Sequence, residues 1–558
     1  MEIIYVSIAI VIIAVIKIIY DNREYERSLE RQMKENWGKI PEQTYTEEKF
    51  KSLEMYFREH YVPNLDVDDI TWNDLDMDNI FMLMNQTQTA MGEEYLYSLL
   101  RKPLYDEAKL KERDDLIEFF QREQKTRFEV QKSIGKLGKL SSISIYEYIN
   151  RVKELEERDS KKHIAYAIGF VLSFLSIFFL FPFGVFLFLF MLANNVTKYY
   201  KAKAEIENYF SVFSYVLRMM DSVKSLNKVE SEKLKPYLDP LKDSYHALRK
   251  FQAGAGVVVS RKAVGGLADM ILDYVRMFMH FDIIKFNSML RELRVHNDEL
   301  MLLFETIGFL DSMIAIGSFR EWLQHDYTKP ELVHSEKPFL NVNDVYHPMI
   351  SNPVRNSIRE KQCVLITGSN ASGKSTFIKT IAMNQILCQT VYMSLSKHHC
   401  SSYFRIFSSM ALRDDLSNNE SYYIVEIKSL KRMLDQANQK IPMLCFVDEV
   451  LRGTNTLERI AASSQILVNF AKTNSICFAA THDIELTYIL ENYYSNYHFQ
   501  EEFHDDTISF NYLLREGRST TKNAINLLKV MGYEDDIIKE AKHNSEEFLR
   551  TGSWNIIS

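Results

Sequence analysis

Cysteine is scarce in this sequence, with five residues in a chain of 558. The cysteines all fall in the C-terminal part of the chain, and none forms a CxxC pair: Cys363, Cys388, Cys400, Cys445 and Cys477. An odd number without that spacing argues against a disulfide framework and against a zinc module, and it is typical of a reducing compartment. We expect these side chains to be small buried apolar groups.

Positive charge is not in excess either. Lys and Arg number 67 against 75 Asp and Glu, which gives a formal net charge of −8. Non-specific DNA binding depends on neutralising phosphates, so a dedicated nucleic-acid binder usually carries a basic excess. The balance disfavours that class, although a local basic patch remains compatible with it. Apolar residues make up 46% of the chain, which argues against disorder and for about two or three domains with real cores.

Glycine and proline are scarce between residues 71 and 330 apart from Pro182, Gly184 and the glycines near 254–266, and apolar residues recur there at steps of three and four. This pattern predicts long packed helices. The sequence shows no internal repeat of fixed period. After Pro330 short apolar runs alternate with helical patterns, at 363–368, 443–449, 476–482 and 508–514. Strands that alternate with helices predict a mostly parallel sheet. The predicted fold class is therefore an α/β domain preceded by a mostly α-helical domain.

Long apolar segments are present in two places. The first, residues 3–20, has the length needed to cross a bilayer. It lacks the basic n-region and small-residue cleavage site of a secretory signal, so we expect an uncleaved anchor. Basic residues follow the run and none precedes it, which predicts an outside N-terminus and a cytoplasmic remainder.

The second apolar segment covers residues 164–195 and is too long for one pass. Lysines flank it on both sides, so both flanks favour the cytoplasm. Pro182 and Gly184 break it in the middle. We expect a hairpin of two short membrane helices at about 163–197, and a re-entrant hairpin is the alternative.

These patterns predict five parts of the chain and a multi-pass membrane protein. They are an N-terminal transmembrane anchor (1–21), a connector (22–70), a mostly α-helical domain that contains the hairpin (71–330), an α/β domain in the cytoplasm (331–545) and a polar tail (546–558).

The stretch GSNASGKS at 368–375 matches G-x-x-x-x-G-K-[ST] and lies between an apolar run and a helical pattern. Glycines in such a loop let several N–H groups face a phosphate, and the next helix adds its N-terminal amides. Lys374 is predicted to meet the β- and γ-phosphates, and Ser375 to bind Mg²⁺. The predicted ATP-binding loop comprises Gly368, Ser369, Asn370, Ala371, Ser372, Gly373, Lys374, Ser375 and Thr376.

Two acids end the apolar run LCFVDE, at Asp448 and Glu449. Charges at the end of a buried strand are costly unless they have a partner. We predict that Asp448 holds Mg²⁺ and that Glu449 is the general base for an attacking water. His482 ends a later run, FAATHD, and is predicted to stabilise the γ-phosphate.

These motifs resemble the MutS family of ABC-type ATPases. DEVLRGTNT at 448–456, DDLSNNESYYIVE at 414–426 and YHPMI at 346–350 are similar to its ATPase segments, and 71–106 is similar to the start of its lever domain. The resemblance implies a head-to-tail homodimer in which Ser421 reaches the partner's nucleotide. It also implies that Asn370 contacts the γ-phosphate region, and that Arg452, Gly453 and Thr454 couple the acids to the dimer contact.

The sequence departs from the family pattern at several positions. Ser369 replaces a usual Pro, Ala371-Ser372 replaces Met-Gly, Asn419 replaces a Gly, and Leu451 replaces a Gly after the acid pair. None of these changes removes a catalytic side chain. Residues 1–70 leave no room for the family's mismatch-reading domain with its Phe-x-Glu wedge, so we do not expect mismatches to be read in that way.

Three functions fit these observations. The first is a membrane-anchored MutS-like ATPase that binds lipid through 3–20 and 164–195, uses ATP and Mg²⁺, and transmits dimer closure through helical levers, with DNA binding implied by family alone. The second is an ABC-type transporter ATPase, which three short membrane passes and LSNNE at 416–420, in place of a glycine-rich signature, disfavour. The third is a scaffold in which the ATPase is a slow switch.

Overall fold

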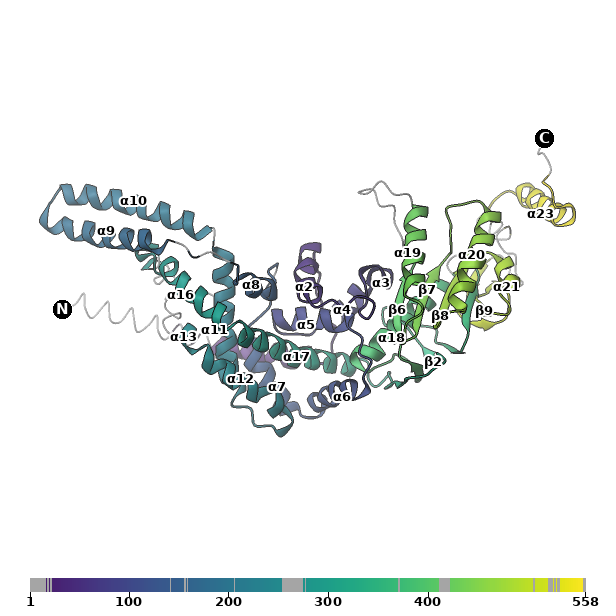
Figure 1. Cartoon of the computed structure of the whole chain (residues 1–558), viewed down its shortest axis with the longest axis horizontal. Helices are drawn as coiled ribbons and strands as arrows, with labels where there is room; N and C mark the ends of the chain where they lie inside the picture. The colour runs from purple at the N-terminus through teal and green to yellow at the C-terminus, as the bar shows by residue number, and fades with distance from the viewer. Residues whose placement is uncertain are drawn as a thin grey trace. The chain divides into compact units, whose positions relative to one another are not determined.

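The computed structural model (Figure 1) describes residues 17, 20, 23–140, 142–154, 157, 159–204, 206–252, 274–275, 277–369, 372–410, 422–504, 507–519, 525, 528 and 532–554. The chain divides into two compact units. Unit 1 comprises Met1–Tyr61, Phe81–Leu99 and Arg113–Gln324, and unit 2 comprises Val62–Ile80, Leu100–Glu112 and His325–Ser558. The five-part division made from the sequence stays a prediction.

Unit 1 is helical in its described part, as the spacing of apolar residues predicted. Its elements are α2 (Glu47–Glu59), α7 (Gln124–Gly135), α8 (Ile145–Arg151), α9 (Ser160–Phe179), α10 (Phe183–Ala204), α11 (Glu207–Leu226), the short 3₁₀ helix η1 (Glu232–Leu234), α12 (Lys235–Ala247), α13 (Arg249–Gln252), α16 (Phe281–Val295) and α17 (Asn297–Trp322). Helices α4 (Met77–Met84), α5 (Ala90–Arg101) and α6 (Glu107–Arg122) include residues of both units.

Helix α17 forms the core of unit 1 and packs against α7, α8, α12 and α16. It is long and apolar enough to cross a membrane, but 78% of its most apolar window is buried inside the unit. Asp311 on α17 accepts hydrogen bonds from the N–H groups of Gln88 at 3.0 Å and Thr89 at 2.9 Å. Because a helix leaves its first N–H groups without intrahelical partners, this carboxylate fixes the start of α5 on α17.

Helices α9 and α10 form an antiparallel hairpin, and Figure 1 shows the two helices side by side. A Cβ at Gly184 would lie 2.3 Å from the carbonyl oxygen of Ser176, so only glycine permits this close approach of the two helices. Only 11% of the most apolar window of α9 is buried. Large apolar side chains are exposed along the hairpin, including Phe178, Phe179, Phe181, Phe183, Phe186 and Phe190.

The hairpin exists as a structural element at the predicted place, and its insertion in a membrane stays a prediction. Among the described residues, α9 and α17 are the helices long and apolar enough to cross a bilayer. The predicted anchor at residues 3–20 lies outside the described part of the chain, apart from Lys17 and Tyr20.

Unit 2 contains a six-stranded sheet in the order β12-β9-β4-β8-β7-β6. Strands β9, β4, β8, β7 and β6 are parallel, and β12 pairs antiparallel with β9. Their bounds are β4 (Cys363–Thr367), β6 (Arg405–Ser409), β7 (Met443–Asp448), β8 (Ser475–Thr481), β9 (Tyr494–His498) and β12 (Arg515–Glu516). Three of the four predicted strands therefore lie side by side in the centre of a mostly parallel sheet.

The fourth predicted strand occupies a different place. Strand β11 (Thr507–Phe510) pairs antiparallel with β10 (Glu501–His504) in a separate two-stranded sheet. A second sheet, in the order β1-β5-β2-β3, contains β1 (Glu331–Val333), β2 (Leu340–Val345), β3 (Asn356–Glu360) and β5 (His398–Ser402). The remaining elements of unit 2 are α3 (Asp69–Asp74), α18 (Lys374–Val391), α19 (Tyr422–Gln436), α20 (Thr456–Ala471), α21 (Ile484–Ile489) and α23 (Asp535–Thr551). Helix α23 includes the first part of the predicted polar tail.

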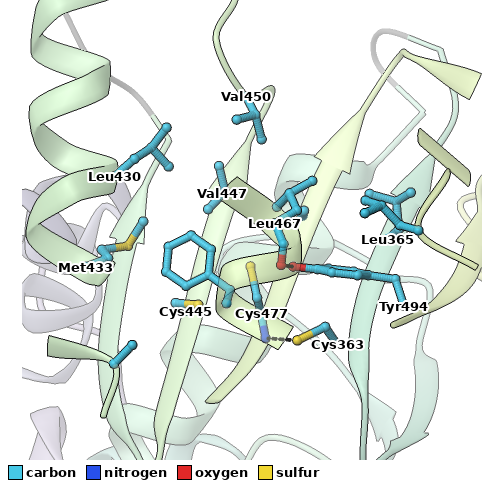
Figure 2. Packing of buried hydrophobic residues seen from close by; sticks show 14 of the residues in the cluster. Cys363, Leu365, Leu430, Met433, Cys445, Val447, Val450, Leu467, Cys477 and Tyr494 are labelled. Atoms are coloured by element: carbon cyan, nitrogen blue, oxygen red, sulfur yellow. Dashed lines mark hydrogen bonds between the residues drawn. The ribbon is translucent and has the colours of Figure 1, made fainter. Parts of the chain in front are cut away.

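One face of the six-stranded sheet forms an apolar core with α19 and α20 (Figure 2). Cys477 on β8 lies opposite Cys445 on β7, and Cys363 on β4 lies one residue before the β4–β8 pair of Val364 and Phe478. The three thiols thus form a row across adjacent strands, and Tyr494 on β9 continues it. Burial raises the pKa of the Cys363 and Cys445 thiols, so they stay neutral apolar groups, as the sequence predicted.

Candidate functional site

The predicted phosphate-binding loop connects β4 to α18 at the carboxyl end of the sheet. Gly368 and Gly373 have φ of 147° and 107°, a region that favours glycine. A Cβ at Gly368 would also lie 2.8 Å from the carbonyl oxygen of Phe499. Both glycines are therefore required by the shape of the loop. Asn370 and Ala371, at its centre, lie outside the described residues.

Lys374 folds back over this loop. Its Nζ atom donates hydrogen bonds to the carbonyl oxygens of Gly368 and Ser369, each at 2.8 Å, and lies 3.5 Å from His482 Nε2. Burial lowers the pKa of Lys374, and the charges of Asp448 and Glu449 act in the opposite direction. A buried ammonium held beside two acids is arranged to meet an anion.

Ser375 and Asp448 come together from α18 and from the end of β7. The Ser375 hydroxyl donates to Asp448 Oδ2 at 2.5 Å. The other carboxylate oxygen, Oδ1, is buried and has no hydrogen-bond partner among the described residues. A hydroxyl and a carboxylate with a free oxygen are hard oxygen ligands of the kind that Mg²⁺ prefers, so these residues fit the metal.

Glu449 lies next to this pair and contacts two basic side chains. Its Oε1 atom is 2.9 Å from His482 Nε2, and its Oε2 atom forms an ion pair with Arg452 Nε. Burial would raise the pKa of Glu449, but the hydrogen bond from His482 and the charge of Arg452 hold it below its ordinary value. The carboxylate is therefore ionised at neutral pH, the state that a general base requires.

Of these groups, Lys374, Ser375 and Glu449 line a cavity of about 630 Å³, a size within the usual range for small-molecule sites. The loop, Glu449 and Arg452 form its polar end. The other walls come from segments that the sequence did not single out as ligand contacts, among them Tyr346, His347, Pro353, Val354, Phe499 and Tyr512.

Tyr512 shows how these walls are held. Its backbone has φ of 54°, and its carbonyl oxygen accepts a hydrogen bond from Asn356 Nδ2 at 3.0 Å. The Asn356 Oδ1 atom accepts from the N–H of Leu514 at 2.8 Å, so one amide side chain fixes both sides of the turn. Asn356 belongs to no recognisable motif. The sequence signals nearby were YHPMI, which includes Tyr346 and His347, and the predicted strand 508–514, which includes Tyr512.

The remaining predicted residues are placed as follows. Thr376 lines the cavity, and Ser372 is buried with its hydroxyl unpaired among the described residues. Thr454 donates to Glu458 at 3.3 Å on α20 and is exposed to solvent only in part. Ser421 lies outside the described residues, so its predicted contact with a partner stays a prediction.

Two regions of the chain match models of a known protein family. A profile described as MutS domain V matches residues 364–549, and one described as MutS domain III matches residues 62–256. The first region contains the predicted phosphate-binding loop, the two acids and His482. The second region begins shortly before α3 and covers much of unit 1.

The chain belongs to the MutS family.

Individual relatives agree with this assignment. The DNA mismatch repair protein MutS of Thermotoga maritima is 28% identical over 266 residues, which cover 46% of this chain and 33% of the relative. The MutS protein homolog 4 of Mus musculus is 28% identical over 281 residues, 47% of this chain and 28% of the relative. The matched region thus spans about a third of the length of these relatives. Domain V is the P-loop ATPase domain of the MutS family.

Proposed function

We propose that this MutS-family protein binds and hydrolyses Mg²⁺-ATP. The observation that carries the proposal is that Lys374, Ser375 and Glu449 line one cavity, while Asp448 accepts a hydrogen bond from Ser375. The acids come from the end of a central strand and the cation from the adjacent loop, the arrangement used for phosphoryl transfer to water.

Each side chain has a role that follows from its place. Lys374 binds the β- and γ-phosphates in place of the carbonyl oxygens that it contacts in this structure. Ser375 and Asp448 would hold Mg²⁺, which would supply positive charge against the charge that develops on the phosphates. Glu449 orients the attacking water and accepts its proton, and His482, 2.9 Å from Glu449, stabilises the γ-phosphate.

Glu449 is fully paired in this structure, so the base requires a change before it can meet a water. Arg452 holds one carboxylate oxygen, and its side chain is half-exposed. Movement of Arg452 toward a partner subunit would free that oxygen. We infer that the active form is a head-to-tail homodimer in which Ser421 of one chain completes the other chain's site.

We infer further that the protein works at a membrane. The exposed aromatic residues of the α9–α10 hairpin support this, because soluble monomers rarely expose an apolar surface of this extent. With the N-terminal apolar run they would make a multi-pass protein whose ATPase domain lies in the cytoplasm. Lever helices would then transmit ATP-driven closure to the hairpin or to a bound partner.

DNA is the second candidate partner, because two of the relatives carry the name DNA mismatch repair protein. The alternative function is an ABC-type ATPase that energises transport or acts as a scaffold without DNA. One experiment separates these: the ATPase rate of the detergent-solubilised full chain, with and without duplex or branched DNA.

Stimulation by DNA, together with binding that weakens steeply with salt, would support a nucleic-acid role. An ATPase rate that DNA leaves unchanged would point to a membrane partner. The absence of nucleotide binding by the purified chain would contradict the proposed function itself.

A further inference from the structure

The turn after β7 has an unusual backbone. Glu449 and Leu451 have φ of 58° and 59°, in the left-handed region that disfavours residues with a Cβ. Leu451 stands where the related family pattern has glycine, and its side chain is buried in the apolar core of the sheet. The turn that presents Glu449 to the cavity is therefore strained and needs support from outside itself.

Glu426 on α19 gives that support. Its Oε1 atom accepts a hydrogen bond from the N–H of Leu451, and a second backbone hydrogen bond comes from Arg452. The residue is only 3% exposed, and its Oε2 atom has no hydrogen-bond partner among the described residues. A buried carboxyl group is costly unless it is hydrogen-bonded, and here one of its oxygens accepts from the backbone of the turn.

A second contact joins the same two elements. A Cβ at Gly453 would lie 3.0 Å from the Cβ of Tyr423, so the turn packs directly on the first residues of α19. The same helix is fastened to the sheet, since Arg432 donates to the carbonyl oxygen of Ser408 on β6 at 2.6 Å. The turn thus rests on a helix that is itself fixed.

We propose that Glu426 is a positioning residue for hydrolysis. Its carboxyl oxygen holds the N–H groups of Leu451 and Arg452, and through them it sets the direction of Glu449 and the place of the Arg452 guanidinium. Glu426 lies five residues after Ser421, the residue proposed to reach the partner's nucleotide. Helix α19, which holds the turn, therefore begins directly after the residue proposed to make the dimer contact. This inference rests on the proposed ATPase function.

The test compares two substitutions in the full-length chain. Glu426→Gln keeps an acceptor oxygen of the same size at the turn, and Glu426→Ala removes it. We expect Glu426→Ala to lower kcat at least tenfold while KM for ATP changes less than threefold, and Glu426→Gln to stay within threefold of the parent in both. Asp435→Ala is the control, because Asp435 is an exposed residue of α19 paired with Lys431 away from the turn.

Unchanged kcat in Glu426→Ala would overturn the proposal. So would a parallel loss of kcat, nucleotide affinity and Tm, because that pattern indicates a purely structural role. Equal damage from Gln and Ala would show that the acceptor oxygen is not the cause.

Hydrogen exchange tests the positioning without relying on turnover. A peptide covering 449–455 should lose protection in Glu426→Ala and keep it in Glu426→Gln. Should the parent chain hydrolyse no ATP, the proposed function fails, and the exchange result still decides whether Glu426 holds the turn.

Discussion

At the scale of single residues, Glu449 makes the sharpest prediction. Its carboxylate is ionised and lies between His482 and Arg452. Glu449→Gln keeps the volume but cannot accept a proton, so we expect turnover to fall by about 100-fold or more while ATP affinity stays within about threefold. Phosphate release and equilibrium nucleotide binding measure the two quantities.

The matched control for this substitution is Glu491→Gln. Glu491 lies in the same unit and forms a surface ion pair with Arg518 at 2.7 Å. Such exposed pairs contribute little to stability, so this variant should behave as the parent does. Unchanged turnover in Glu449→Gln would mean that another group activates the water.

Site residues that belong to a motif with fixed spacing could be predicted from the sequence, and residues that only support them could not. GSNASGKS predicts a loop because the loop's backbone needs glycine, as the φ of 147° at Gly368 shows. Asn356 is brought to the cavity by tertiary folding, and nothing local marks it. Tyr512 lies in the predicted strand 508–514, but its place in a cavity wall could not be predicted from that run. Glu426 ends the quoted segment 414–426, but its bond to the Leu451 N–H depends on a turn that the sequence does not reveal.

At the scale of elements, the α9–α10 hairpin gives a prediction about lipid. Phe186 and Phe190 are 71% and 68% exposed. Replacing both with Arg should cost about 2.5–3.5 kcal/mol each in a bilayer interior, so co-sedimentation with vesicles should drop sharply. The measurement should be made on the full chain and on a chain without residues 1–21, since that segment could hold the protein on vesicles alone.

The control for the hairpin is Tyr488→Arg, which changes an equally exposed aromatic residue of unit 2, at 61%. It should leave vesicle binding unchanged. Full retention of binding by the double Arg variant that also lacks residues 1–21 would exclude the hairpin as a membrane element.

Helix α8 gives a prediction about pH. Glu94 accepts hydrogen bonds from Ser144 Oγ and from the N–H of Ile145, both at 2.7 Å, and so fixes the start of this helix. Burial raises the pKa of Glu94 from 4.5 to about 8. The unfolded chain releases this proton near pH 4.5 and the folded chain near pH 8, so the folded state holds one more proton between them.

The free energy of unfolding of unit 1 should therefore fall as pH rises through that window, by at most about 1.4 kcal/mol per pH unit. Denaturant unfolding at several pH values measures this slope. Glu94→Gln, which cannot ionise, should flatten it, and an unchanged slope in that variant would assign the effect to other groups.

The elements that the sequence missed are those in which buried polar side chains hide the strand pattern. Strand β6 is buried at every position although Arg405 and two serines lie in it. Arg405 is accommodated by the carbonyl oxygens of Ile441 and Gln436, at 3.0 and 2.6 Å, which lie far along the chain. Such hydrogen-bond partners exist only in the folded unit. An edge strand of this kind therefore has no apolar run from which it could be predicted.

At the scale of the whole molecule, a head-to-tail dimer makes a quantitative prediction about mixtures. Lys374→Ala damages a chain's own site, and Ser421→Ala damages the partner's site. Each variant alone should be inactive. An equimolar mixture forms mixed dimers in which one site has both residues, so about a quarter of the parental ATPase activity should return.

Activity measured after the two variants are co-incubated tests this arrangement. A mixture as inactive as its components, under conditions in which mixed dimers are shown to form, would contradict composite sites. Full activity of Ser421→Ala alone would show that each chain's site is complete without its partner.

The row of thiols across β4, β8 and β7 has a practical consequence for studying the two units separately. Every cysteine of the chain lies in unit 2, and four of the five are buried, with only Cys400 partly accessible. A thiol-reactive dye should therefore label the native protein at one position and gain the other four only when unit 2 opens. Labelling kinetics would report the opening of unit 2 in isolation, even in detergent or lipid, because unit 1 contains no cysteine for the reagent to label.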